Sequence, residues 1–269
     1  MTPNAQAPVA DPPARVPAPS VPASSIPSVT VAQMAEVDRL AISEFGVTLL
    51  QMMEQAGSHL AEVVRLELGG DLRDRFVVVA VGPGNNGAGG LAAARHLLNR
   101  GAWVRVVLAR PALRMSEAGR HQLATLIAMN ASCCVATFDL SDDELIDVLG
   151  RADLIVDALL GYNASGAPGD EVGRLVGLIG DSGRPVVSLD VPTGLNPDTG
   201  AAANPAIVAI ATVTLALPKI GLLGPEASSK TGRLYLADIG LPASLYARLG
   251  LDIGPLFGPG RILQLDGTR

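Results

Sequence analysis

The fold is decided by residues 76–99, which read FVVVAVGPGNNGAGGLAAARHLLN. The first six residues, Phe76–Val81, form an apolar, β-branched run that ends at a glycine, and this pattern predicts a buried strand. The glycine-rich segment 82–90 predicts a tight loop, and residues 91–99 carry apolar side chains at helical spacing. A strand, a loop and a helix in this order are typical of the unit that builds parallel sheets.

The same alternation continues toward the C-terminus. Further strands are expected at residues 103–109, 132–138, 153–158, 185–189, 212–217 and 233–237, with helices at residues 116–130, 142–149 and 169–180. Short apolar strands separated by amphipathic helices predict a Rossmann-like, doubly wound α/β fold, in which a mostly parallel sheet has helices on both faces. Right-handed crossovers place the carboxyl ends of the strands at one edge, where such sheets bind ligands.

Two helices are expected before the first strand, one that is capped by Ser28 or Thr30 and runs to about Ala41, and one from Leu49 to about Leu68. Residues 1–28 contain eight prolines and no basic, continuously apolar signal sequence, so they are expected to form a disordered Pro/Ala-rich leader. No internal repeat or second linker is present. We therefore expect a single α/β domain over residues 29–250 and a C-terminal tail over residues 251–269.

Composition limits the classes of partner. The chain has 269 residues, 48% of them hydrophobic, and a formal net charge of -6. An acidic chain without a basic run lacks the positive surface that nucleic acid requires, so no nucleic acid partner is expected. The longest nearly uncharged apolar run, residues 206–217, is too short to span a bilayer, so no membrane association is expected. The adjacent Cys133 and Cys134 suit buried free thiols, and a cytoplasmic location is expected.

The glycine-rich segment predicts a phosphate-binding loop, because glycines allow close approach and a following helix start offers unpaired N–H groups. Gly82, Gly84 and Gly87 also fit the G-x-G-x-x-G pattern of dinucleotide-binding dehydrogenases. Such a site needs an acidic residue at the end of the second strand, where this chain has Ala109-Arg110 instead. A simple flexible turn is the alternative interpretation of the segment.

Two later strands end in the same way, one at Asp157 and one at Asp190. Two charged carboxylates at the same sheet edge repel each other, which raises the free energy of the folded state. One of them is therefore expected to take a proton, or a cation to lie between them. Thr193 and Asn86 could add hydroxyl and amide oxygens, and an oxygen-only ligand set suits a hard cation rather than zinc. The alternative is that one Asp caps a turn and the other is solvated. His59, His96 and His121 are interpreted as residues on helix surfaces.

Several segments taken together resemble one known family, the NAD(P)H-hydrate epimerases of the YjeF N-terminal type. The resemblance rests on MEQAG (53–57), GPGNNG (82–87), VDALLG (156–161), LDVPTG (189–194) with DTG (198–200), TLALPK (214–219) and ADIGLP (237–242). These proteins interconvert the R and S forms of hydrated NADH and NADPH, and an S-specific dehydratase then restores the cofactor.

The resemblance implies a set of site residues. Asp190 would be catalytic, and a potassium ion would be held by Asn86, Asp157 and Thr193. The hydrated NADH or NADPH would be bound by Asp190 together with Asn85, Asn86, Gly87, Ala88, Gly89, Gly161, Tyr162, Asn163, Ala164, Ser165, Gly166 and Ala167. The functional partner would be the S-specific dehydratase, and the apolar first helices are compatible with a homodimer.

The chain departs from the family pattern at three places. Gly89 stands where the family usually has Asp, Thr193 replaces a Ser, and Tyr162-Asn163 replaces Thr-Gly. These departures keep a second hypothesis open, a nucleotide-binding or scaffolding module that has lost catalysis. A pyridine-nucleotide dehydrogenase is a third. The sequence also leaves open whether Lys219 contacts substrate or only ends a strand.

Overall fold

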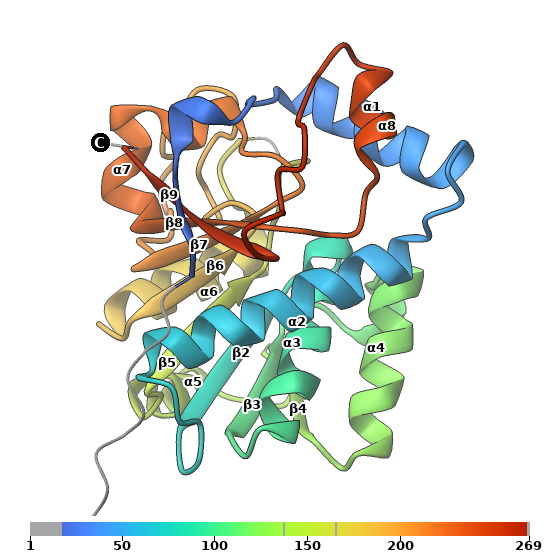
Figure 1. The fold of residues 1–269 in the computed structure, drawn as a ribbon. Coiled ribbons are helices and arrows are strands. Elements are labelled where there is room, and N and C mark those ends of the chain that lie inside the picture. The colour runs from blue at the N-terminus through green and yellow to red at the C-terminus, as the bar shows by residue number, and fades with distance from the viewer. Residues whose placement is uncertain (1–17, 137, 165, 268–269) are drawn as a thin grey trace, which may run out of the picture.

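In the described part of the chain, nine strands form one sheet in the order β1-β9-β8-β7-β6-β5-β2-β3-β4 (Figure 1). The computed structural model describes residues 18–136, 138–164 and 166–267. Neighbouring strands are parallel except β8 and β9, which are antiparallel. The strands are β1 (Ser20–Pro22), β2 (Phe76–Val81), β3 (Trp103–Leu108), β4 (Ser132–Val135), β5 (Leu154–Ala158), β6 (Val186–Leu189), β7 (Ala211–Leu215), β8 (Arg233–Ala237) and β9 (Ile262–Asp266).

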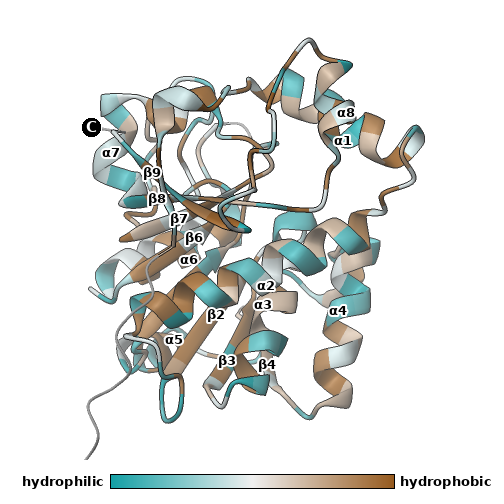
Figure 2. Cartoon of the chain, viewed as in Figure 1, coloured by the Kyte–Doolittle hydropathy of each residue, from teal (hydrophilic) through white to brown (hydrophobic). Residues whose placement is uncertain are grey.

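Helices cover both faces of this sheet, so the predicted doubly wound α/β fold is confirmed. One apolar core joins α1, α2, α3, α4 and α8 to one face, and a second core joins α5 and α6 to the other. Figure 2 shows brown strands β2 and β3 beneath helices that mix brown with teal. The helices are α1 (Val31–Ser43), α2 (Leu49–Glu67), α3 (Asn85–Asn99), α4 (Glu117–Ala128), α5 (Asp142–Gly150), α6 (Asp170–Asp181), α7 (Pro225–Thr231) and α8 (Ala243–Ala247).

Capping residues set the start of the first two helices. Thr30 accepts a hydrogen bond from the Gln33 backbone N–H, and the Gln33 side chain bonds back to Thr30, which completes a capping box. Thr48 and Gln51 form the same arrangement at α2. These reciprocal bonds satisfy N–H groups that a helix start leaves unpaired, so α1 begins just after Thr30, one of the two capping residues that the sequence offered.

The two ends of the chain differ from expectation. Residues 20–22 of the predicted leader form β1, which pairs in parallel with β9 from the predicted tail. The prediction of disorder up to residue 28 is therefore wrong for residues 18–28, and the sheet extends past residue 250. Residues 1–17 lie outside the described part of the chain, so the prediction for them stays open. In the described part, no helix is long and apolar enough to span a membrane.

The largest local difference is the start of α3. The helix begins at Asn85, six residues earlier than expected, so most of the predicted glycine loop is helical. The reason is tertiary packing: a Cβ on Gly57 of α2 would lie 2.5 Å from the Ala92 Cβ, and one on Gly87 would lie 2.0 Å from the Gly82 carbonyl oxygen. The glycines thus allow close contact between backbones, and only a short turn remains between β2 and α3.

The predicted surface position is not found for one of the three histidines. His59 is buried, and burial lowers the pKa of its imidazole, with a smaller contribution from Arg261. The other two lie nearer the surface: His96 is half-buried and its Nε2 lies 2.8 Å from Glu54 Oε1, whereas His121 is exposed. The helix-surface interpretation is therefore wrong for His59.

Candidate active site

A pocket of about 410 Å³ lies at the carboxyl ends of β2, β5, β6 and β7. After β2 the strands β3 and β4 are added on one side, and β5 to β8 are added on the other, so the strand order reverses between β2 and β5. Ligands of open α/β sheets bind at such a point. The volume is within the range of small-molecule sites, about 300–1,000 Å³. The pocket is lined by Met34, Asp38, Leu49, Met52, Met53, Pro83, Gly84, Asn85, Asn86, Leu159, Leu160, Gly161, Tyr162, Asn163, Ala164, Asp190, Leu215, Lys219 and Ile239.

Asp190 follows the last residue of β6 and has an unusual backbone. Its φ is +65°, in the left-handed region that residues other than glycine rarely adopt. Its N–H donates to the Val213 carbonyl oxygen at 2.7 Å. Its carboxylate Oδ2 accepts from the Tyr162 backbone N–H at 2.8 Å. Strained conformations of this kind concentrate at functional sites, and here the strain directs the buried carboxyl group into the pocket.

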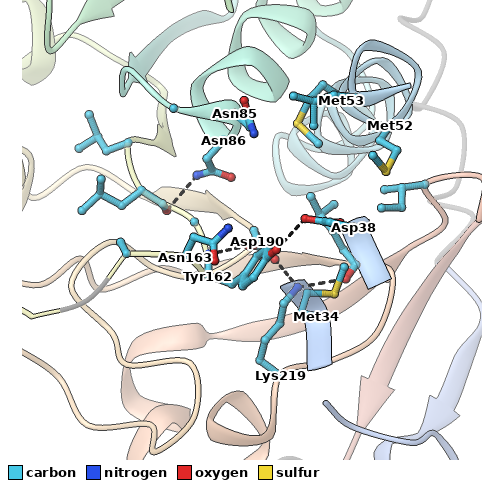
Figure 3. Close-up of a pocket in the computed structure, with 18 of the residues that line it drawn as sticks. Met34, Asp38, Met52, Met53, Asn85, Asn86, Tyr162, Asn163, Asp190 and Lys219 are labelled. Carbon is cyan, nitrogen blue, oxygen red and sulfur yellow. Dashed lines mark hydrogen bonds and ion pairs between the residues drawn. The ribbon is translucent and has the colours of Figure 1, made fainter. Parts of the chain in front are cut away.

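Lys219 supplies the positive charge beside Asp190. Its Nζ lies 2.5 Å from Asp190 Oδ1, donates to the Leu215 carbonyl oxygen at 3.0 Å, and lies 5.4 Å from the centre of the Tyr162 ring. Both members of the ion pair are buried. Lys219 is therefore part of the pocket wall, four residues beyond the end of β7 (Figure 3).

Asp157 has a different environment from Asp190. It is fully buried, and it accepts hydrogen bonds from Ser188 Oγ at 2.8 Å and from the Thr193 N–H and hydroxyl at 2.9 and 2.7 Å. Burial raises the pKa of its carboxyl group, although these hydrogen bonds act in the opposite direction. The sequence predicted that one of the two acids takes a proton or that a cation lies between them. The structure adds a charge that the sequence did not predict, because Lys219 pairs with Asp190, whereas the side-chain donors to Asp157 are neutral hydroxyl groups.

Asn86 connects the strand ends. Its Nδ2 donates to the carbonyl oxygens of Leu160 at 2.9 Å and Leu189 at 3.3 Å, and the Leu160 N–H donates to Thr193 Oγ1 at 3.1 Å. Asn86, Asp157 and Thr193 thus belong to one hydrogen-bonded network at the ends of β2, β5 and β6. In the described residues, no three His, Cys, Asp or Glu side chains gather as ligands for a metal ion.

The predicted substrate-binding residues divide into two groups. Those that line the pocket are Asn85, Asn86, Gly161, Tyr162, Asn163, Ala164 and Asp190. Those that do not line it are Gly87, Ala88 and Gly89, which are buried inside α3, and Gly166 and Ala167, which are exposed. Ser165 lies outside the described residues. Within residues 82–90, where a phosphate-binding loop was expected, Pro83, Gly84, Asn85 and Asn86 line the pocket.

Comparison with known proteins identifies the family of this chain. The family model described as "YjeF-related protein N-terminus" matches residues 49–221. The chain belongs to this family. The NAD(P)H-hydrate epimerase of Dehalogenimonas lykanthroporepellens is 39% identical over 224 residues, which cover 83% of this chain and 86% of that protein.

Other relatives in the YjeF-related family differ in length. The bifunctional NAD(P)H-hydrate repair enzyme Nnr of Moorella thermoacetica is 40% identical over 220 residues, and the match spans 81% of this chain but only 41% of that enzyme. The crystal structure of the yeast protein YNL200c superposes with a TM-score of 0.73 at 25% identity, covering 89% of this chain and all of that one. The similarity thus extends well beyond the glycine-rich segment.

The family resemblance drawn from the sequence implies an Asp at the position of Gly89. A Cβ at Gly89 would lie 2.7 Å from Leu189 Cδ2, 3.7 Å from Met53 Sδ and 3.8 Å from the Ala56 Cβ. Gly89 is buried, the nearest neighbours of such a Cβ are apolar, and Gly89 itself does not line the pocket.

We expect Gly89→Asp to destabilise the fold without raising any activity of the pocket. Gly89→Ala is the matched control, since it adds the same Cβ without the charge. The Asp variant should be less stable than the Ala variant by about 1–3 kcal/mol, the cost of an unsatisfied buried polar group. Denaturant unfolding of the three proteins measures this difference. A Gly89→Asp protein as stable as the wild type and more active would contradict this placement.

The sequence reasoning missed Asp38, which lines the pocket from α1. Its Oδ2 accepts a hydrogen bond from the Tyr162 hydroxyl at 2.6 Å. A signal was present in the sequence: Asp38 follows Met34 by four residues, so the two lie on the same face of the helix. An acidic residue on that apolar face needs a polar partner, and Tyr162 provides it.

Proposed function

We propose that this chain is an NAD(P)H-hydrate epimerase, an isomerase that interconverts the R and S forms of hydrated NADH and NADPH. The observation that carries the proposal is the buried Asp190–Lys219 ion pair in the wall of a pocket at the switch point of the sheet. The names of relatives that match over most of their length support the same activity.

The chemistry requires one carbon of the nicotinamide ring to lose its configuration. In the hydrate, C6 carries a hydroxyl group and is bonded to the ring nitrogen, so inversion requires either the C–O or the C–N bond to break and form again. Both routes move a proton to and from oxygen. The ion pair with Lys219 presents Asp190 as a carboxylate, which is the form that accepts this proton, and the Tyr162 N–H fixes its orientation.

The walls of the pocket fit the rest of the substrate. The N-terminus of α3, with Asn85 and Asn86 in its first turn, offers backbone N–H groups and a positive dipole end to phosphate groups. Apolar side chains from α1 and α2 also line the pocket and can contact a ring: Met34, Leu49, Met52 and Met53. The scaffold hypothesis was motivated by Gly89 and by the Tyr162 loop; Gly89 does not line the pocket, whereas Tyr162 does. The retained Asn86, Asp157, Asp190 and Thr193 support the epimerase, and the assay below decides between the two hypotheses.

We also propose that Asn86, Asp157 and Thr193 hold a potassium ion. They supply only oxygen ligands, which suits a hard cation, and the side-chain hydrogen bonds to the fully buried Asp157 come from the neutral Ser188 and Thr193. The ion would supply the positive charge that keeps Asp157 ionised and would hold three strand ends together. The functional partner would be an S-specific dehydratase; a cytoplasmic location and a homodimer stay predictions.

A coupled assay tests the proposed function. The purified chain is added to R-hydrate of NADH with an S-specific dehydratase, and NADH recovery is followed by absorbance. We expect faster recovery with the chain than without it, and a higher rate and melting temperature in potassium than in tetramethylammonium, because bound ligands stabilise the folded state. Recovery no faster than without the chain, at every potassium concentration, would exclude the epimerase. An unchanged melting temperature would exclude the potassium site alone.

A further inference from the structure

A second carboxyl group faces the same pocket as Asp190. Asp38 projects from α1, on a different element from Asp190, and both side chains line the cavity. Figure 3 shows Asp38 approaching the cluster of Tyr162, Asp190 and Lys219. Tyr162 links the two acids, because its backbone N–H donates to Asp190 and its hydroxyl donates to Asp38 at 2.6 Å.

The two acids have opposite environments. Lys219 Nζ contacts Asp190 at 2.5 Å, whereas the side-chain partner of Asp38 is a neutral phenol. Burial is the largest influence on Asp38 and raises the pKa of its carboxyl group, although Tyr162 and Lys219 oppose this shift. A pair of carboxyl groups in one site with unlike environments is the arrangement that separates an acid from a base.

Epimerisation by ring opening uses one acid and one base at the same moment. The C6 hydroxyl gives its proton to the Asp190 carboxylate, a C=O double bond forms at C6, and the C6–N1 electron pair moves to N1. N1 must then take a proton from a second group. Rotation exposes the other face of the aldehyde, and closure returns both protons to their donors. No atom or electron is gained or lost over the cycle.

We propose that Asp38, hydrogen-bonded to Tyr162, is the proton donor that acts together with Asp190 in this pocket. This inference rests on the proposed epimerase function. It assigns Tyr162, one of the departures from the family pattern, the role of positioning Asp38. It also gives α1 a catalytic group in addition to its apolar contacts with the core.

The test compares Asp38→Asn, Tyr162→Phe and Glu36→Gln in the epimerisation assay. Asn keeps the shape of Asp38 and an acceptor for the Tyr162 hydroxyl but cannot donate a carboxyl proton. Glu36→Gln is the matched control, because it makes the same chemical change on α1 at a residue that pairs with Arg39. We expect Asp38→Asn to lower kcat about 100-fold, since general acid catalysis contributes roughly 10²–10⁴-fold, with KM changed less than about threefold.

The outcomes separate this inference from the proposed function. Tyr162→Phe should lower kcat less than Asp38→Asn, and Glu36→Gln should match the wild type. A folded Asp38→Asn protein with less than about a tenfold loss in kcat would overturn the inference and leave the epimerase intact. If Asp38→Asn does not fold, full activity of Tyr162→Phe overturns it instead. A wild-type chain without epimerisation would remove the proposed function and this inference together.

Discussion

Asp190→Asn is expected to lower the kcat for epimerisation by roughly 10²–10⁴-fold, the range that general acid–base groups contribute. The carboxamide has the same shape and can still accept from the Tyr162 N–H, but it does not accept a proton near neutral pH. Asn also tolerates the left-handed backbone found at residue 190, so the substitution adds little strain there. The measurement is the initial rate of epimer interconversion at saturating hydrate.

The same substitution leaves the Lys219 ammonium buried without its carboxylate, so a control for stability is needed. The double variant Asp190→Asn with Lys219→Met removes both charges. We expect it to be as inactive as Asp190→Asn but closer to the wild type in stability. A folded Asp190→Asn protein with the kcat of the wild type would contradict the assignment of Asp190 as the base.

Lys219→Met is expected to lower the free energy of unfolding by about 3–5 kcal/mol, the usual cost of removing one member of a buried ion pair. Met keeps most of the apolar stem, so the loss reports mainly the Asp190 carboxylate left without its cation. Lys230→Met provides the comparison, since Lys230 is half-buried in α7 and its loss should have little effect. Denaturant unfolding at neutral pH measures all three proteins.

A double-mutant cycle completes this prediction. Adding Asp190→Asn to Lys219→Met should restore part of the lost stability, because the uncompensated charge is then removed. A loss of less than about 1 kcal/mol in the free energy of unfolding of Lys219→Met is typical of exposed ion pairs. That result would contradict the assignment of Asp190 and Lys219 as a buried ion pair.

The parts of the fold that local patterns encode were predicted closely. β2 and β8 have the predicted bounds, because each is an apolar run that ends beside a turn residue. The start of α3 was predicted six residues too late, since glycine is a poor helix former in isolation. What makes Gly87–Gly90 helical is the close contact with Gly82, Leu189 and Ala158, which depends on residues distant in the sequence.

The pairing of strands β1 and β9 also depends on residues that are distant in the sequence. β1 has only three residues, its last residue is Pro22 and the residue before it is Pro19, and its partner is at the other end of the chain. Proline-rich composition is typical of disordered segments, and no local pattern indicates a distant partner strand. Pairing between sequence-distant segments is therefore the part of this sheet that composition could not predict.

For the site, the strand-end argument identified Asp157, Asp190 and Thr193, and the structure places them at adjacent strand ends. It did not identify the charges that accompany them. Lys219 lies four residues beyond β7, and Asp38 comes from a helix, so neither follows a strand directly. Which cation compensates Asp190 depended on how these elements pack, and that information is tertiary.

The most direct test of the account uses one separated epimer and the purified chain alone. R-hydrate of NADH is followed by proton NMR at neutral pH in potassium buffer, with and without the protein. We predict that the chain speeds relaxation to the equilibrium mixture of R and S forms, and that Asp190→Asn does not. Identical relaxation rates in buffer and with the folded wild-type chain would contradict the account.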